Sequence, residues 1–219
     1  MTWLSYSWGH IADLLLIHLA ITIPPILISI LIAVPIGRLA FRYPRLGGPL
    51  LSASTLLNAI PALPLLIIIP VLFGTSLRSS ATITIALTVY GVALLVRSAA
   101  DGFESVDPAV RQAALAVGYS KRHMLWLVDL PLATPVIVSG IRVVTVSTVG
   151  LTTIGALVGI QSLGSLFTDG FQRDIPASIV TGIVLTVIVA LALDALVQLI
   201  GYLLTPWTRA GSSRGVGVS

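Results

Sequence analysis

Long apolar runs separated by short polar segments dominate this chain. A helix that crosses a bilayer needs about 20 mostly apolar residues, because every backbone polar group in hydrocarbon must be paired within the segment. Five stretches meet this requirement, at about residues 11–37, 49–74, 80–100, 132–158 and 175–205. The pattern predicts an all-α integral membrane protein with five transmembrane helices. We expect one transmembrane domain over residues 1–207 and a disordered tail over residues 208–219.

The composition supports a membrane protein and excludes several other classes. Of the 219 residues, 56% are hydrophobic and only 9% are charged, whereas soluble domains carry about a quarter charged residues. The net charge of +4 comes from basic residues scattered over short loops, which does not match the clustered basic surface of a nucleic-acid-binding protein. With no cysteine in the chain, disulfides and thiolate metal sites are excluded.

Basic residues gather on one side of the expected spans. They occupy the segments after the first, third and fifth spans: Arg38, Arg42, Arg45, Arg97, Arg111, Lys121, Arg122, Arg209 and Arg214. Arg78 and Arg173 fall on the opposite side. Because Lys and Arg concentrate in cytoplasmic loops, we expect an external N-terminus, a cytoplasmic C-terminus and tail, and a cytoplasmic segment between the third and fourth spans.

Prolines are frequent in the first two expected spans, where they form the set Pro24, Pro25, Pro35, Pro61, Pro64 and Pro70. Each removes a backbone donor and clashes with the preceding turn, so both helices are expected to be kinked or locally unwound. Two interpretations stay open. The prolines bend the helices for packing, or the backbone around Asn58 and Pro61 is irregular because it borders a translocation path, since such irregularity is tolerated against protein or a water-filled cavity.

The polar segment before the fourth span, about residues 103–131, has the pattern of two short helices. Asp107 is expected to cap a helix with Pro108 at its first position, and Gly118 is expected to end it. A second short helix is predicted over residues 119–126. This segment could be an interfacial amphipathic helix that anchors a loop, or a docking element for another protein.

The spacing within this segment resembles a known motif. In RQAALAVGYSKRHMLWLVDLP, Gln112 precedes two alanines and three further residues before Gly118, and nine more residues lead to Val128 and then to Leu130 and Pro131. This resembles the EAA loop of the membrane-spanning subunits of ABC importers. The resemblance implies a cytoplasmic coupling helix on which an ABC ATPase docks, through Asp107, Pro108, Arg111, Gln112, Ala113, Ala114, Gly118, Tyr119, Leu130 and Pro131.

Gln112 departs from this motif, which usually has Glu at that place. Glutamine keeps an acceptor oxygen but carries no charge, and hydrogen bonds to ionised groups are about twice as strong as neutral ones. A contact from this position to a basic residue of the ATPase would therefore be weaker.

A wider resemblance covers about residues 46–202. The segments NAIPALPLLIIIP, GFESVDPAVRQAALAVG, LPLATPVIVSGIRVVTVSTVGLTTIGALVG and GSLFTDGF resemble permeases of osmoprotectant importers, which carry glycine betaine, carnitine, choline or proline betaine. The resemblance implies a type I ABC importer permease in the prokaryotic cytoplasmic membrane, surrounded by lipid. It also implies a second permease subunit, identical or similar, an extracytoplasmic binding protein, and ATPase partners that bind the ATP, with no cofactor in this chain.

Small polar residues of the fourth span are candidates for a translocation path. Thr145, Thr148 and Thr152 could line a mildly polar route together with Asn58 and Pro61, or they could serve helix packing, since small polar residues let membrane helices approach closely. Recognition of a quaternary ammonium usually needs an aromatic cage. Because most aromatics here lie near expected membrane interfaces, that cage is expected on the binding protein.

Several ionisable residues lie in or beside the expected spans, and one of them, His18 of the first span, is interpreted as a helix-contact histidine. Asp194 in the fifth span is expected to pair within the bundle, and Arg142 of the fourth span is a candidate partner, because unpaired charges are costly in a membrane. Asp129 is expected at the membrane interface. The alternatives that stay open are an ABC permease for another solute, such as methionine, another amino acid or an oxyanion, and a transporter or channel that works without an ATPase.

Overall fold

The computed structural model describes residues 2–207 of the chain, and its side chains over residues 7–207. All regular elements in this range are helical. They are α1 (Thr2–Arg42), α2 (Pro44–Ala59), α3 (Ala62–Phe73), α4 (Ser80–Glu104), α5 (Pro108–Ala116), α6 (Lys121–Met124), a π-helical turn (Leu125–Asp129), α7 (Leu130–Ile154), a 3₁₀ turn (Gly155–Val158), α8 (Ser165–Gln172) and α9 (Pro176–Leu204). The tail expected over residues 208–219 lies outside the described residues.

Within the described part of the chain, four helices are long and apolar enough to cross a membrane: α1, α4, the helix that continues from α6 through α7, and α9. The second expected span is divided between α2 and α3, which meet at an angle of 109°. If this bent pair forms one broken span, the number of spans is five.

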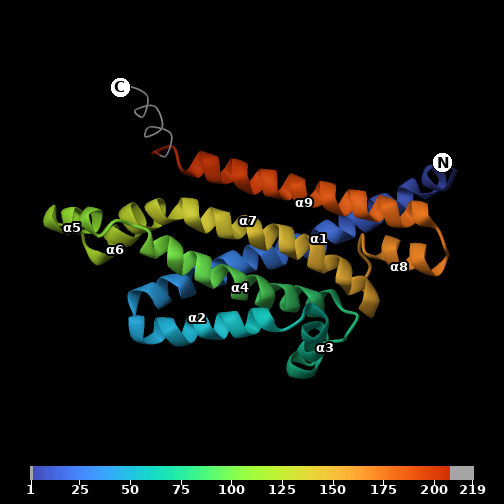
Figure 1. Cartoon of the computed structure of the whole chain (residues 1–219), viewed down its shortest axis with the longest axis horizontal. Coiled ribbons are helices and arrows are strands. Elements are labelled where there is room, and N and C mark those ends of the chain that lie inside the picture. The colour runs from blue at the N-terminus through green and yellow to red at the C-terminus, as the bar shows by residue number, and fades with distance from the viewer. Residues whose placement is uncertain (1, 208–219) are drawn as a thin grey trace, which may run out of the picture.

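The prolines have different consequences in the first and second expected spans. At the α2–α3 junction the backbone is extended, with ψ of 124° at Ile60 and 146° at Pro61, which confirms the expected local break. By contrast, α1 continues as one helix through its three prolines, so it is not locally unwound; the expected kink there stays a prediction. The neighbouring α4 runs beside α1 (Figure 1), and such packing keeps a proline-containing helix intact.

The centre of the molecule is formed by α1, α4 and α7, which approach closely at glycines. A Cβ atom on Gly37 of α1 would lie 2.5 Å from Cβ of Ala99 on α4, and one on Gly140 of α7 would lie 2.5 Å from Cβ of Ser98. Glycine therefore lets these helices pack with their backbones nearly in contact, which is a common way for membrane helices to associate.

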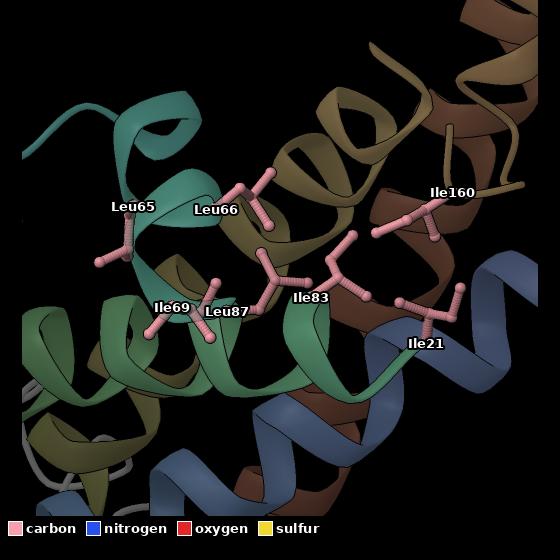
Figure 2. Packing of buried hydrophobic residues seen from close by; sticks show 8 residues of the cluster. Ile21, Leu65, Leu66, Ile69, Ile83, Leu87 and Ile160 are labelled. Atoms are coloured by element: carbon pink, nitrogen blue, oxygen red, sulfur yellow. The ribbon is translucent and has the colours of Figure 1, made fainter. Parts of the chain in front are cut away.

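The short helix α3 packs on α4 although it projects from the bundle (Figure 1). Its buried side chains Leu66 and Ile69 belong to one apolar cluster with Ile83 and Leu87 of α4 and with Ile160 (Figure 2). Several of its other apolar side chains, including Val71 at 83%, remain exposed. In a membrane protein such a surface faces lipid or another subunit.

The two ends of the bundle carry different short helices. Helices α5 and α6 lie at one end, and α8 lies at the other, next to the N-terminal part of α1 (Figure 1). The polar segment that the sequence sets apart is therefore separated from α8 by the length of the spanning helices.

Candidate functional site

The start and end of α5 have the local structure that the sequence predicts. The carboxylate of Asp107 accepts a hydrogen bond of 2.7 Å from the backbone N–H of Ala109, and Pro108 occupies the first turn. At the other end, Gly118 has a φ of 91°, and the N–H of Tyr119 donates to the carbonyl of Ala114 at 3.0 Å. This is a Schellman arrangement, which needs a left-handed residue and so favours glycine.

No residue of α5 is buried. Its apolar side chains Val110 and Leu115 are exposed, as is Val117 just after the helix, and Gln112 is exposed as well. Exposed apolar side chains are a frequent property of protein interaction surfaces. At 3.6 residues per turn these side chains lie on more than one side of the short helix, and we call the exposed surface of Val110, Gln112, Leu115 and Val117 together the α5 face.

The other predicted docking residues lie around α5 with different exposure. Asp107, Pro108, Ala113, Gly118 and Tyr119 are exposed, whereas Arg111, Ala114, Leu130 and Pro131 are partly buried. The structure thus gathers most of the predicted residues on one accessible end of the molecule. Their docking role stays a prediction.

Arg111 folds back against the bundle. Its Nε donates to Oδ1 of Asp129 at 2.7 Å, its Nη1 donates to the carbonyl of Val106 at 3.0 Å, and its Nη2 donates to the carbonyl of Phe103. The guanidinium also lies 4.7 Å from the centroid of the Phe41 ring, within the range of a cation–π contact. Arg111 therefore fastens α5 to α1, to the end of α4 and to the π-helical turn.

Asp129 is the centre of this cluster. Its side chain is 3% exposed, and it accepts a second hydrogen bond, of 2.6 Å, from Nη1 of Arg38 on α1. The Arg38 guanidinium lies 5.1 Å from the Phe103 ring centroid. Hydrogen-bonded partners make the burial of a carboxylate tolerable, and the sequence did not predict that Asp129 is buried between two arginines; its place at the membrane interface stays a prediction. We call Arg38, Arg111 and Asp129 the charged clamp.

Sequence reasoning missed the clamp because its members are far apart in the chain. Asp129 is separated from Arg38 by 91 positions and from Arg111 by 18, so no helical or strand spacing joins them. The available signal was charge balance, since an acid directly before an apolar span needs a basic partner.

The candidate path residues occupy two different environments. Thr145, Thr148 and Thr152 are 1%, 2% and 0% exposed, and Oγ1 of Thr152 lies 3.0 Å from Oγ1 of Thr22 on α1. Asn58 and Pro61 are exposed at the α2–α3 break. The structure does not bring all five onto one accessible surface, and the buried positions of the threonines favour the packing interpretation. Their role in a path stays a prediction.

An ion pair joins the fourth and fifth expected spans. Arg142 of α7 donates from Nε and Nη2 to the two carboxylate oxygens of Asp194 on α9, each at 2.8 Å. This bidentate contact confirms the pairing that the sequence suggested. It is the geometry in which guanidinium and carboxylate bind most strongly.

A bundle of membrane-length helices, an accessible capped helix at one end and a motif that fits it together indicate a transport subunit. The profile of the family described as "Binding-protein-dependent transport system inner membrane component" matches residues 25–210. The chain belongs to this family. Its members are membrane components of transport systems, and the apolar helices of this permease agree with a multi-pass position in the membrane.

Individual relatives of this permease have related names. The chain is 31% identical to the osmoprotectant import permease protein OsmW of Salmonella typhimurium, over 90% of this chain and 93% of that protein. It is 28% identical to the glycine betaine/carnitine/choline transport system permease protein OpuCD of Bacillus subtilis, over 94% and 89% of the two chains.

Solved structures with the same fold include transport proteins. A chain of the MetNI methionine ABC transporter in an inward facing conformation superimposes with a TM-score of 0.79 at 22% identity, covering 94% of this chain and 98% of that one. A chain of an amino acid ABC transporter crystallised with histidines gives a TM-score of 0.71 at 16% identity, covering 94% and 96%. At these identities the likeness concerns the fold, which is that of a type I ABC importer permease.

Proposed function

We propose that this permease forms the translocation path of an ATP-driven importer for a small zwitterionic or quaternary-amine osmoprotectant. The observation that carries the proposal is the α5 face. It presents apolar side chains to water at one end of a membrane bundle, and the charged clamp holds it in place. A surface of this kind fits a protein partner. The names of the relatives support the substrate class.

In this proposal an ABC ATPase docks on the α5 face and on the residues around it, Asp107, Pro108, Gln112, Ala113, Gly118 and Tyr119. ATP binds to that partner, and this chain needs no cofactor. Because Gln112 is uncharged, a hydrogen bond from a basic residue of the ATPase to its amide oxygen contributes less binding free energy than the same bond to a glutamate carboxylate would. The exposed apolar residues Val110, Leu115 and Val117 then supply more of the contact.

The proposed topology has five spans, with α2 and α3 together forming the second. The N-terminus is outside and the C-terminus inside, in agreement with the positive-inside rule. An extracytoplasmic binding protein delivers the substrate at the end that carries α8, and a second permease subunit, identical or similar, completes the path.

Single cysteines test this orientation cleanly, because the chain has none of its own. We expect a thiol at Gln112→Cys to react with a membrane-impermeant reagent only after intact cells are opened. A thiol at Gln172→Cys, exposed at the end of α8, is expected to react in intact cells. The reverse pattern would overturn the topology.

Transport itself is tested with the complete complex in proteoliposomes. The expected result is accumulation of labelled glycine betaine or choline that requires the ATPase subunit, ATP and the binding protein, and that excess methionine does not inhibit. Accumulation without ATP would point to an ion-coupled transporter. ATP-driven uptake inhibited by methionine, with none of betaine or choline, would assign a different substrate.

A further inference from the structure

A cavity of about 240 Å³ lies between α7 and α9 beside the Arg142–Asp194 ion pair. Ser139 and Arg142 of α7 contribute to its wall, and so do Gln198 and Tyr202 of α9, while Pro135 and Val138 supply apolar surface. The candidate path residues Thr145, Thr148 and Thr152 do not line it. The cavity is therefore a site with both polar and apolar walls, between two expected spans, that the sequence analysis did not predict.

The depth of the ion pair decides what this face can contact. At a rise of 1.5 Å per residue, Arg142 lies about 18 Å from the start of α7 at Leu130, and Asp194 lies about 15 Å from the end of α9 at Leu204. Both helix ends belong to the end of the bundle that carries α5 (Figure 1). Because the hydrocarbon core is about 30 Å thick, the pair is close to the middle of the membrane.

The ion pair is not sealed within the chain. The side chain of Arg142 is 40% exposed and that of Asp194 is 19% exposed. Charged groups at this depth are costly in lipid, and they characteristically face the interior of an assembly or a water-filled cavity. The face of α7 and α9 that carries Arg142, Ser139 and Gln198 is therefore directed at water or protein.

The guanidinium keeps donors for a ligand. A guanidinium has five N–H donors, and the contact with Asp194 uses Nε and Nη2. Within the described part of the chain, Nη1 of Arg142 donates to no acceptor. Together with the amide of Gln198 on the same wall, it can bind a carboxylate, because guanidinium and carboxylate match in shape and charge.

The remaining walls fit the other end of a zwitterion. A quaternary ammonium has no N–H to donate, and proteins favour it through aromatic faces and apolar contact. The Tyr202 ring and the apolar surfaces of Pro135 and Val138 offer both. Because Asp194 balances the charge of Arg142, the cavity carries no net charge, which suits a ligand that is itself neutral overall.

We propose that this cavity is a transient binding site for a zwitterion on its way through the permease, with its carboxylate on Arg142 and Gln198 and its quaternary ammonium against Tyr202. The assignment rests on the proposed function for its substrate class. One aromatic ring and a guanidinium already shared with Asp194 make a weak site. Weak binding favours release, since a tightly bound substrate would stay in the path.

Protection of an introduced cysteine tests the site without changing the charged residues. Ser139→Cys places a thiol on the cavity wall, and Leu196→Cys is the matched control, because Leu196 is on α9 but lines a separate apolar groove. The complete transporter is reconstituted, and labelling by a charged methanethiosulfonate reagent is timed with and without glycine betaine. The transporter that lacks introduced cysteines supplies the background from partner subunits.

We expect Ser139→Cys to react and Leu196→Cys to react far more slowly. Glycine betaine at twice its dissociation constant should slow the labelling of Ser139→Cys about threefold, because labelling is blocked in the occupied fraction of the transporter. Choline, which lacks the carboxylate, should protect less at the same concentration. A Ser139→Cys thiol that is inert, or that reacts equally fast with betaine present, overturns the site.

The double variant Arg142→Gln with Asp194→Asn provides the second arm. It removes both charges together, so neither is left unpaired, and Ser139→Cys is introduced into it. Protection by betaine should be lost, and protection that persists unchanged overturns the assignment to Arg142.

Betaine uptake by the wild-type complex separates the proposed importer function from the proposed cavity site. Uptake without protection removes this site alone, while protection without uptake removes the proposed function and leaves the site.

Discussion

Nε of Arg111 donates to Oδ1 of Asp129 at 2.7 Å, and this bond joins α5 to the residue directly before α7. Arg38 holds the other carboxylate oxygen from α1. Any displacement of α5 by a bound protein is therefore passed to two membrane helices through one carboxylate. The contact surface and the spanning helices are connected by charge-assisted hydrogen bonds as well as by the chain itself.

Asp129→Asn should weaken the clamp. The amide keeps the shape of the carboxylate but not its charge, and a hydrogen bond to a charged group contributes about 1.5–3 kcal/mol. We expect a lower thermal unfolding temperature of the purified complex in detergent and reduced ATP-dependent uptake. Asp107→Asn is the matched control. It makes the same chemical change at an exposed cap, where Asn serves as well as Asp, so unaltered stability is expected there. Equal stability of the two variants would contradict a role for the clamp.

Gly118→Val should impair coupling. Gly118 has a φ of 91°, and a left-handed conformation costs an ordinary residue about 1–2 kcal/mol, with more for a β-branched side chain. We expect normal membrane insertion, weaker retention of the ATPase on an affinity column, and a loss of uptake of about fivefold to thirtyfold. Gly118→Asn should retain most activity, because Asn tolerates this conformation. Wild-type uptake by Gly118→Val would show that the turn can relax.

Thr152→Val separates packing from transport in the fourth span. Valine keeps the shape of threonine and removes the hydroxyl that lies 3.0 Å from Thr22. Hydrogen bonds between membrane helices contribute about 0.6 kcal/mol on average, so a small fall in unfolding temperature is expected while betaine uptake is unchanged. A large drop in uptake with normal stability would instead place this threonine on the path.

Gly164→Ala should disturb folding at the end that carries α8. Its new Cβ atom would lie 2.1 Å from the carbonyl oxygen of Thr153, which belongs to the backbone. Overpacking of this kind costs about 1–3 kcal/mol or more, and we expect less complex in the membrane and a lower unfolding temperature. Gly150→Ala is the control, since a Cβ there meets nothing within 4 Å. If both variants accumulate like the wild type, this close contact is not required.

The long helices and the limits of α5 were predictable because their signals are local. Apolar length identifies the four long helices, and Asp107 with Pro108 and Gly118 marks the ends of α5 through capping rules that involve neighbours in the chain. The same reasoning succeeded for Arg142 and Asp194, because two opposite charges in adjacent spans have few other partners.

Tertiary proximity was harder to predict. The ion pairs of Asp129 were not predicted, because a sequence window does not reveal that Arg38 and Arg111 fold onto it. The effect of proline was equally dependent on context. Pro61 accompanies a sharp bend, whereas Pro24 and Pro25 lie within a continuous helix that α4 accompanies. Helix propensity gives the local cost of a proline, and packing against a neighbouring helix helps to decide whether the helix continues past it.

The glycine contacts of α4 limit how the permease can move. With Gly37 and Gly140 bringing α1 and α7 against it, α4 has no room for neighbouring helices to slide past one another. If the proposed importer alternates its access between the two sides of the membrane, we expect these three helices to move as one rigid body. We expect shape change within the subunit to concentrate at the α2–α3 bend, where the two helices are bent by 109°, because α9 is tied to α7 by the Arg142–Asp194 ion pair.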